Sequence, residues 1–191
     1  MATTTPTSSR TAHLLELMTG GDDAFNARDF EAVDAVHHPE MIAFIPGLAE
    51  PVYGRDAHAA AMQQFLRSFP DMHVDTPYPI QFGAGDWITV VTRARGTFTG
   101  EMTLPDGNLV PPTGKAFDVE FAQTSKWDGD RLIWISAFWD TALQARQLGL
   151  MSPSDGKRTG SRDPLVPRAA LQKSWASTST WPFATSQRNA S

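Results

Sequence analysis

The chain changes from helix-type to strand-type patterning near residue 70, and this switch constrains its fold more than any other feature. Before that point, apolar residues recur at helical spacing, and Asp and Pro residues mark helix ends. After it, long stretches are rich in β-branched and aromatic residues. Helices followed by a meander of long strands indicate an α+β fold, in which three N-terminal helices pack on one face of a cone-shaped, curved antiparallel sheet.

Local signals in the first part of the chain predict helices. The first covers 11–27, and Gly20-Gly21 allows a break in it, because each glycine costs about 1 kcal/mol relative to alanine inside a helix. Asp29 is expected to cap a second helix over 30–37, which ends before Pro39.

A short apolar strand is expected over 41–45, followed by a third helix. Asp56 is a typical N-cap residue, and the apolar residues after it follow helical spacing as far as Phe69. All three helices are therefore expected before the long strands.

The second half of the chain predicts four long strands and a short helix. The strands are expected over 73–82, 87–99, 115–127 and 131–141. Asp128-Gly129-Asp130 is expected to join the last two strands as a hairpin, because tight hairpin turns favour Gly and Asp. The final helix is expected over 142–148 and ends at Gly149. A sheet that curves over helices leaves an apolar cavity, which is a natural place for a small ligand.

The composition excludes several classes of protein. The 191 residues contain no cysteine, which excludes disulfide scaffolds, thiolate metal sites and cysteine nucleophiles. A net charge of −5 argues against general binding to nucleic acid, which requires a basic surface. No apolar run reaches the roughly 18 residues of a membrane span, and the polar N-terminus does not resemble a secretory signal. We expect a soluble, cytoplasmic protein that binds neither nucleic acid nor membranes.

The chain is expected to contain one folded domain over 11–151. Residues 152–191 hold six basic and two acidic residues, are rich in Ser, Thr and Pro, and show no hydrophobic period. This composition is typical of a flexible basic tail. Residues 1–10 are expected to form a disordered N-terminus.

Alternation along the last two strands separates two faces. One face carries Phe117, Val119, Phe121, Gln123 and Ser125, together with Ile133, Ile135, Ala137 and Trp139. If this face lines the cavity, the cavity is apolar with one amide. The expected substrate-binding residues are Phe121, Gln123, Ile135, Ala137 and Trp139. The opposite face carries Trp134 and Phe138, which the interface of a homodimer would bury.

Several groups of residues follow one another in a recognisable order along 11–150. They are Phe25-Asn26-Ala27-Arg28, His38-Pro39-Glu40, Gly54-Arg55-Asp56, Phe69-Pro70-Asp71, Pro111-Pro112-Thr113-Gly114-Lys115, and Trp139-Asp140 with Gln147-Leu148-Gly149-Leu150. Together they resemble the SnoaL-like polyketide cyclase (ester cyclase) family of the nuclear transport factor 2-like superfamily. The resemblance implies a cone-shaped α+β barrel that is often dimeric and uses no metal or organic cofactor.

The best-known members of that family close a ring by an intramolecular aldol reaction, in which a carboxylate in an apolar pocket takes a proton from a carbon next to carbonyls. The resemblance places the catalytic Asp at the position of Ala137, a pocket His at Gln123 and a pocket Asn at Ala43. Alanine cannot transfer a proton, so the cyclase mechanism cannot be carried over unchanged.

Two side chains are candidates for the missing proton carrier, and we expect Asp140 and His73 as catalytic residues. Asp140 could reach the mouth of the pocket, or it could instead cap the short helix that follows it. His73 could form an acid–base pair with Asp71, or it could be a surface or core histidine.

Other polar residues suggest further alternatives. His37-His38 could suggest a metal, but adjacent histidines point apart and lack an acidic residue at ligand spacing, so a role at the end of a helix is expected. Arg93 and Arg95, with a carboxylate, could resemble the epoxide hydrolases of the superfamily. Tyr53 and Tyr78 could donate to an oxyanion or an epoxide if they are buried.

The sequence therefore predicts a cofactor-free enzyme of secondary metabolism that cyclises or isomerises a hydrophobic polyketide- or terpenoid-like molecule. A non-catalytic module that binds a ligand or dimerises is the alternative, because Ala137 and Gln123 replace the family's catalytic Asp and pocket His. An epoxide hydrolase-like activity is a second alternative.

Overall fold

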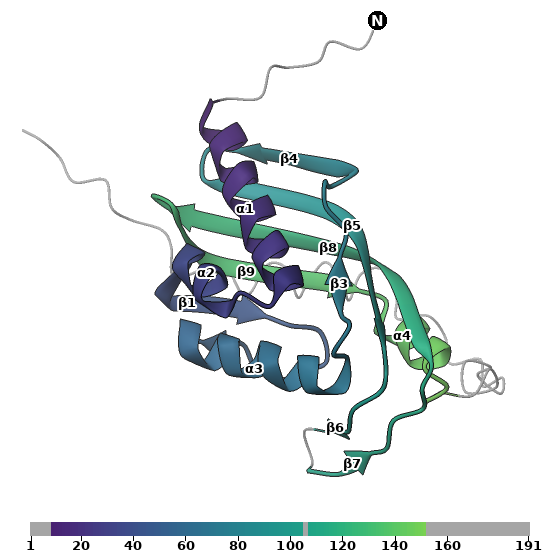
Figure 1. The fold of residues 1–191 in the computed structure, drawn as a ribbon. Helices are drawn as coiled ribbons and strands as arrows, with labels where there is room; N and C mark the ends of the chain where they lie inside the picture. Colours follow the sequence, from purple (N-terminus) through teal and green to yellow (C-terminus); the bar gives the residue numbers. More distant parts are fainter. Residues whose placement is uncertain (1–8, 105–106, 152–191) are drawn as a thin grey trace, which may run out of the picture. The chain divides into compact units, whose positions relative to one another are not determined.

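The computed structural model describes residues 9–104 and 107–151, and Figure 1 shows how their helices and strands are arranged. The expectations for residues 1–8 and 152–191 lie outside these ranges, whereas Ser9 and Arg10, which were expected in a disordered N-terminus, are the first residues of a helix. The helices are α1 (Ser9–Ala27), α2 (Phe30–Val36), α3 (Arg55–Ser68) and α4 (Thr141–Gln147). The first three precede the long strands, as expected, and α4 follows the last strand.

Helix α1 is continuous through Gly20 and Gly21, where the sequence allowed a break. Leu14 and Met18 are buried in the core and hold the helix against the sheet. A Cβ atom at Gly21 would lie 3.4 Å from Cγ2 of Val36, an ordinary van der Waals distance, so α2 packs beside this part of α1. Packing of this kind outweighs the glycine cost of about 1 kcal/mol.

The caps of α2 and α3 differ in kind. Asp29 caps α2 as expected, since its side chain accepts a 3.1 Å hydrogen bond from the Ala32 N–H. The expectation for Asp56 is wrong, because the N-cap of α3 is Gly54, whose φ of +87° is a backbone conformation that favours glycine. Asp56 lies instead in the first turn, where its charge is favourable at the N-terminal end of the helix.

The main sheet has the strand order β2-β1-β9-β8-β5-β3, and β4 also pairs with β5. The strands are β1 (His37–Phe44), β2 (Val52–Tyr53), β3 (His73–Val74), β4 (Ile80–Ala84), β5 (Trp87–Thr97), β6 (Met102–Thr103), β7 (Leu109–Val110), β8 (Ala116–Asp128) and β9 (Arg131–Trp139). Strands β6 and β7 form a separate pair. Because β1 pairs with β9 in parallel and the other pairs are antiparallel, the sheet is mixed rather than wholly antiparallel.

The single strand expected over 73–82 is two strands in the structure. Both β3 and β4 pair with β5, and the segment between them contains Pro77 and Pro79. Proline has no backbone N–H to donate to a neighbouring strand, so the pairing stops there. This irregular segment carries Tyr78 into the core.

The hairpin between β8 and β9 forms as expected. Asp128 pairs with Arg131, which leaves Gly129 and Asp130 as the turn. Towards this turn a β-bulge shifts the register, so that Trp127 pairs with Leu132. Both of these side chains are buried, whereas simple alternation assigned the inner face to Ile133 instead of Leu132.

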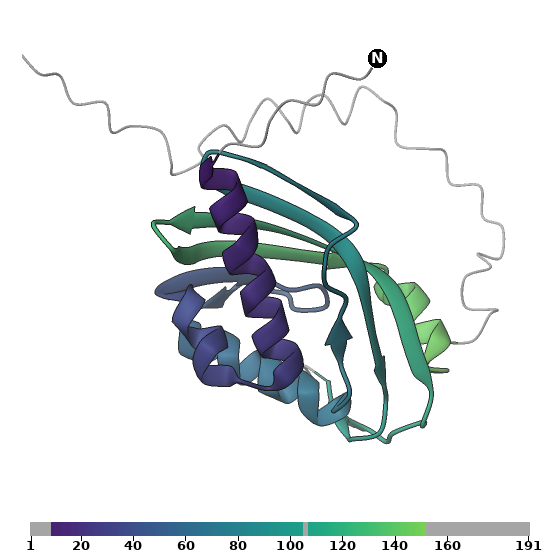
Figure 2. The same ribbon diagram turned by 45° about the horizontal axis from the view of Figure 1, so that its top comes forward.

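Helices α1, α2 and α3 lie on one side of the sheet, which curves around them (Figures 1 and 2). One buried apolar cluster between the layers includes Leu14 and Trp127, and a second includes Phe69 and Phe117. The expected architecture, an α+β fold with three N-terminal helices on a curved sheet, is confirmed. The described residues contain no helix that is long and apolar enough to cross a membrane.

Candidate active site

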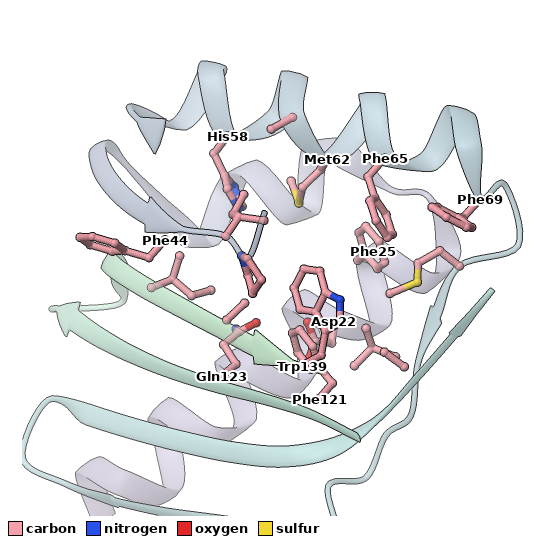
Figure 3. A pocket seen from close by; sticks show the side chains of 18 of the residues that line it. Asp22, Phe25, Phe44, His58, Met62, Phe65, Phe69, Phe121, Gln123 and Trp139 are labelled. Atoms are coloured by element: carbon pink, nitrogen blue, oxygen red, sulfur yellow. The ribbon is translucent and has the colours of Figure 1, made fainter. Parts of the chain in front are cut away.

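A cavity of about 510 Å³ lies between the helices and the sheet. Small-molecule sites in proteins commonly measure about 300–1,000 Å³. Side chains from α1, α2, α3, β1, β5, β8 and β9 line it, and most of them are apolar or aromatic. Figure 3 shows Phe25, Phe65 and Phe69 among the side chains that line it.

The expected substrate-binding residues all belong to the wall of this cavity. They are Phe121, Gln123, Ile135, Ala137 and Trp139. The amide Nε2 of Gln123 lies 3.5 Å from Sδ of Met18, and Nε1 of Trp139 donates a 2.9 Å hydrogen bond to Oε1 of Gln144. Because Gln123 and Ala137 both line the cavity, the alternation predicted for β8 and β9 is correct at these two positions.

Neither expected proton carrier is among the described residues that line the cavity. The carboxylate of Asp140 accepts a 2.8 Å hydrogen bond from the Leu143 N–H. Asp140 is therefore the N-cap of α4, which is the second of the two roles expected for it. His73 is 42% exposed on β3, and its Nε2 lies 3.6 Å from Oδ1 of Asp75. Of the two alternatives for His73, the pair with Asp71 does not form, because Asp71 accepts hydrogen bonds from Thr97, and the position of His73 agrees with the alternative of a surface histidine.

The carboxyl group that lines the cavity is Asp22, which the sequence analysis missed. Asp22 lies on α1 four residues after Met18 and eight after Leu14, so it shares the buried side of the helix. An acidic residue in register with an apolar stripe is the signal that could have found it. Figure 3 shows its position among the labelled aromatic side chains.

Tyr78 is the hydrogen-bond partner of Asp22. Its hydroxyl donates a 2.7 Å hydrogen bond to Oδ2 of Asp22, and the tyrosine is only 5% exposed. Burial raises the pKa of Asp22 to about 6, although the hydrogen bond from Tyr78 partly opposes this and the nearby charge of Asp23 adds to it. Burial and the charge of Asp22 raise the pKa of Tyr78, so its hydroxyl keeps its proton and remains a donor.

Two further polar side chains of the cavity wall are His37 and His58. Their ring centroids are 5.0 Å apart, and the ring planes meet at 72°. Burial lowers the pKa of His37 to about 3 and that of His58 to about 4, so both imidazoles are neutral at pH 7. His37 was predicted only as one of two adjacent histidines with a role at the end of a helix, and His58 was not predicted as a site residue.

The remaining candidates lie elsewhere. Arg93 forms a 2.7 Å ion pair with Asp118, and Arg95 a 2.8 Å ion pair with Asp75, so neither supports the epoxide hydrolase alternative in the cavity. Tyr53 is exposed. Within residues 9–104 and 107–151, no group of three or more His, Asp or Glu side chains could hold a metal ion.

Comparison with known proteins places these features in a family. Residues 16–148 match the model of the SnoaL-like polyketide cyclase family. None of the curated proteins compared with the chain matches it.

Solved structures share the fold. IdmH of Streptomyces antibioticus, a candidate polyketide cyclase, is 26% identical with a TM-score of 0.61, and the match covers 71% of this chain and 98% of that one. A candidate SnoaL-like polyketide cyclase from Jannaschia sp. CCS1 is 18% identical with a TM-score of 0.67, over 78% of this chain and 99% of that one. TsrD of Streptomyces laurentii is 21% identical with a TM-score of 0.61, over 73% of this chain and 97% of that one.

Proposed function

Because the chain belongs to the SnoaL-like polyketide cyclase family, we propose that it is a cofactor-independent enzyme of secondary metabolism. In this proposal it cyclises or isomerises a hydrophobic, polyketide- or terpenoid-like molecule. The observation that carries the proposal is the carboxyl group of Asp22, which lines an apolar cavity of about 510 Å³ and has a raised pKa of about 6.

Asp22 is proposed as the acid–base residue. At pH 7 a carboxyl group with a pKa near 6 is mostly ionised, and it is a stronger base than an ordinary aspartate. Its carboxylate takes a proton from a carbon next to a carbonyl, and the electron pair of the C–H bond moves towards the carbonyl oxygen to give an enolate. Attack of that carbon on a second carbonyl closes a ring, whereas reprotonation at another carbon isomerises the molecule. Asp22 then returns its proton to the product.

Gln123 and Tyr78 support this chemistry in different ways. Among the described residues, the amide N–H of Gln123 has only the weak sulfur acceptor of Met18 as a partner, so it is available to donate to the developing enolate oxygen. Tyr78 does not line the cavity and is proposed as a positioning residue, since its hydroxyl orients the Asp22 carboxyl.

A non-catalytic binding module of the same fold is the competing proposal. Ala137 lines the cavity at the position that the family resemblance gives to the catalytic Asp. A protein that lost this base and gained none would still bind an apolar ligand. The two proposals differ in whether Asp22 moves protons.

Proton exchange on a simple ketone tests this difference. 2-Tetralone is a bicyclic apolar ketone with acidic protons beside its carbonyl, and the rate of their exchange with D₂O is measured by ¹H NMR. We expect the wild-type protein to accelerate the exchange and Asp22→Asn to lose at least tenfold of that acceleration, because proton transfer by a positioned group contributes about 10²–10⁴-fold.

Variants of other carboxylates and of His73 are the controls. Asp23→Asn changes the exposed neighbour of Asp22 on the same helix and is expected to keep the acceleration. Asp140→Asn and His73→Ala test the two carriers that the sequence predicted. Acceleration that survives Asp22→Asn and is lost in either of these would reject Asp22 in favour of that residue. No acceleration by a folded wild-type protein that binds 2-tetralone would favour the binding module.

We further propose that the protein is a homodimer formed through the outer face of the sheet. Trp134 lies on this face, with its ring centroid 5.5 Å from that of Trp87 and 5.6 Å from that of Phe44. Phe138 lies on the same side of β9 as Trp134 and Ser136, and it is 56% exposed. Clustered exposed aromatic residues are typical of an interaction surface.

The cytoplasmic localisation expected from the sequence also stays a prediction.

A further inference from the structure

We infer that the edge-to-face pair of His37 and His58 is a second polar subsite of the cavity, which hydrogen-bonds a hydroxyl or carbonyl oxygen of the ligand. This inference deepens the proposed function and rests on it, because it requires that the cavity binds a small molecule.

The two imidazoles reach the cavity from different elements. His37 is the first residue of β1 and directly follows α2, whereas His58 lies near the start of α3. Both line the cavity, and only 7% of His37 and 6% of His58 is exposed. Their 5.0 Å centroid separation and 72° interplanar angle place the two polar rings side by side in an otherwise largely apolar wall.

Part of the hydrogen-bonding capacity of the pair is not used by the described residues. Nδ1 of His37 and Nδ1 of His58 are both buried and have no hydrogen-bond partner there. Buried polar groups are normally paired, since an unpaired one lowers the stability of the fold. Each imidazole in this cavity wall therefore has spare hydrogen-bonding capacity, which a polar group of a ligand can use.

The charge state of the rings selects the kind of ligand group. Burial, the neighbouring His58 and the guanidinium of Arg55 lower the pKa of His37, while the Val33 carbonyl acts in the opposite direction. Burial alone accounts for the lowered pKa of His58. A neutral imidazole both donates and accepts a hydrogen bond, which suits a hydroxyl or a carbonyl. A carboxylate would require a charged partner to offset its desolvation, so it is disfavoured.

The subsite narrows the class of substrate. Asp22 comes from α1, whereas the histidines come from β1 and α3 (Figure 3 labels Asp22 and His58). The expected substrate is therefore an apolar ring system with an acidic C–H group for Asp22 and a separate uncharged oxygen for the histidine pair. A phenolic or enolic hydroxyl on an aromatic ring meets this description.

Two probes of nearly equal shape test the subsite. 2-Naphthol carries a hydroxyl where 2-methylnaphthalene carries a methyl group, and equilibrium dialysis gives the Kd of each. We expect the wild-type protein to bind 2-naphthol about tenfold more tightly, as one hydrogen bond allows. His58→Phe is expected to abolish this preference without weakening the binding of 2-methylnaphthalene. His58→Gln keeps a donor and an acceptor and is expected to retain most of the preference.

A spectroscopic readout separates hydrogen bonding from structural damage. In the wild-type protein, 2-naphthol is expected to shift the ring ¹⁵N signals of His37 and His58, and 2-methylnaphthalene is expected to leave them in place. His13→Phe changes an exposed histidine that pairs with Asp130 outside the cavity wall, so it is the matched control and is expected to keep the preference.

Each other outcome rejects a stated part of the proposal. Equal binding of the two probes to the wild-type protein, or a preference that persists in both His37→Phe and His58→Phe, rejects the subsite but leaves ligand binding and the role of Asp22 intact. If neither probe binds to the folded wild-type protein, the cavity does not accept aromatic molecules. That result rejects the proposed function together with the subsite.

Discussion

The hydroxyl of Tyr78 donates a 2.7 Å hydrogen bond to Oδ2 of Asp22, and it joins two residues that lie 56 positions apart in the chain. Burial raises the pKa of Asp22 and this hydrogen bond lowers it, with a result of about 6. The balance keeps the carboxyl group mostly ionised near neutral pH while leaving it a stronger base than a solvated aspartate. The pair therefore controls the chemistry that the cavity can perform.

The pH dependence of proton exchange is expected to follow Asp22. Only the carboxylate can accept a proton, so the exchange rate of 2-tetralone should rise through about pH 6 and level off above it. Because the Tyr78 hydrogen bond lowers the pKa of Asp22, Tyr78→Phe should move the inflection to higher pH. The inflection is measured from rates between pH 4.5 and 8. An unchanged inflection in Tyr78→Phe would contradict the proposed role of the tyrosine.

Asp22→Asn is expected to stabilise the protein at high pH. The pKa of Asp22 is about 6 in the folded protein, against 3.8 for an ordinary aspartate. Its contribution to stability is therefore fully present below about pH 3.8 and is lost as the pH rises through about 6, a change of as much as about 3 kcal/mol. Urea denaturation at pH 8 should show Asp22→Asn to be more stable than the wild type, and the difference should vanish near pH 4. Asp23→Asn is expected to show a much smaller gain, because the charge of Asp23 is a lesser cause of the raised pKa of Asp22 than burial.

His58 is expected to make the fold sensitive to mild acid. Its pKa is about 4 in the folded protein and about 6.5 in the unfolded chain, so the stability it contributes is present above pH 6.5 and is lost as the pH falls towards 4. Between pH 7 and 5 this loss is about 2 kcal/mol, while protonation of Asp22 acts in the opposite direction. The loss should be smaller in His58→Gln, as measured by urea denaturation at the two pH values. An identical loss in the variant would show that His58 does not titrate in this range.

Asp140 is expected to matter for stability through its cap of α4. Removing the carboxylate that accepts a hydrogen bond from the Leu143 N–H should cost about 1 kcal/mol in Asp140→Ala. Asp140→Asn should cost much less, because asparagine is also a good N-cap residue. Thermal or urea denaturation measures both effects. If Asp140→Asn instead abolishes proton exchange at unchanged stability, Asp140 is the proton carrier that the sequence predicted.

A charge on the outer face of the sheet is expected to separate the proposed dimer. Phe138 is exposed on β9, so Phe138→Glu should leave the folded protomer intact while placing a charge in the interface. Light scattering coupled to size exclusion measures the mass, and circular dichroism checks the fold. Glu16→Gln removes a charge from an exposed position on α1, on the other side of the sheet, and is expected to leave the mass unchanged. A Phe138→Glu variant with the wild-type mass would place any interface elsewhere.

The sequence by itself determined the parts of this protein that depend on neighbouring residues. The cap of α2 by Asp29, the turn at Gly129 and the alternation that brings Gln123 and Ala137 to one side each rest on a few adjacent positions. Such signals act through local hydrogen bonds and backbone conformation, so they can be recognised without knowledge of the fold. The position of Gly54 as N-cap and the bulge beside Trp127 were missed, because packing and strand register decide them.

Only the tertiary structure decided which polar groups line the cavity. Asp22 looks like one of several acidic residues on α1 until the sheet covers that side of the helix and an irregular segment brings Tyr78 against it. His37 and His58 become a pair only when α3 packs on β1. Their perturbed pKa values come from burial, which depends on which helix faces meet the sheet. Local sequence does not contain that information, because burial is a property of contacts between distant segments.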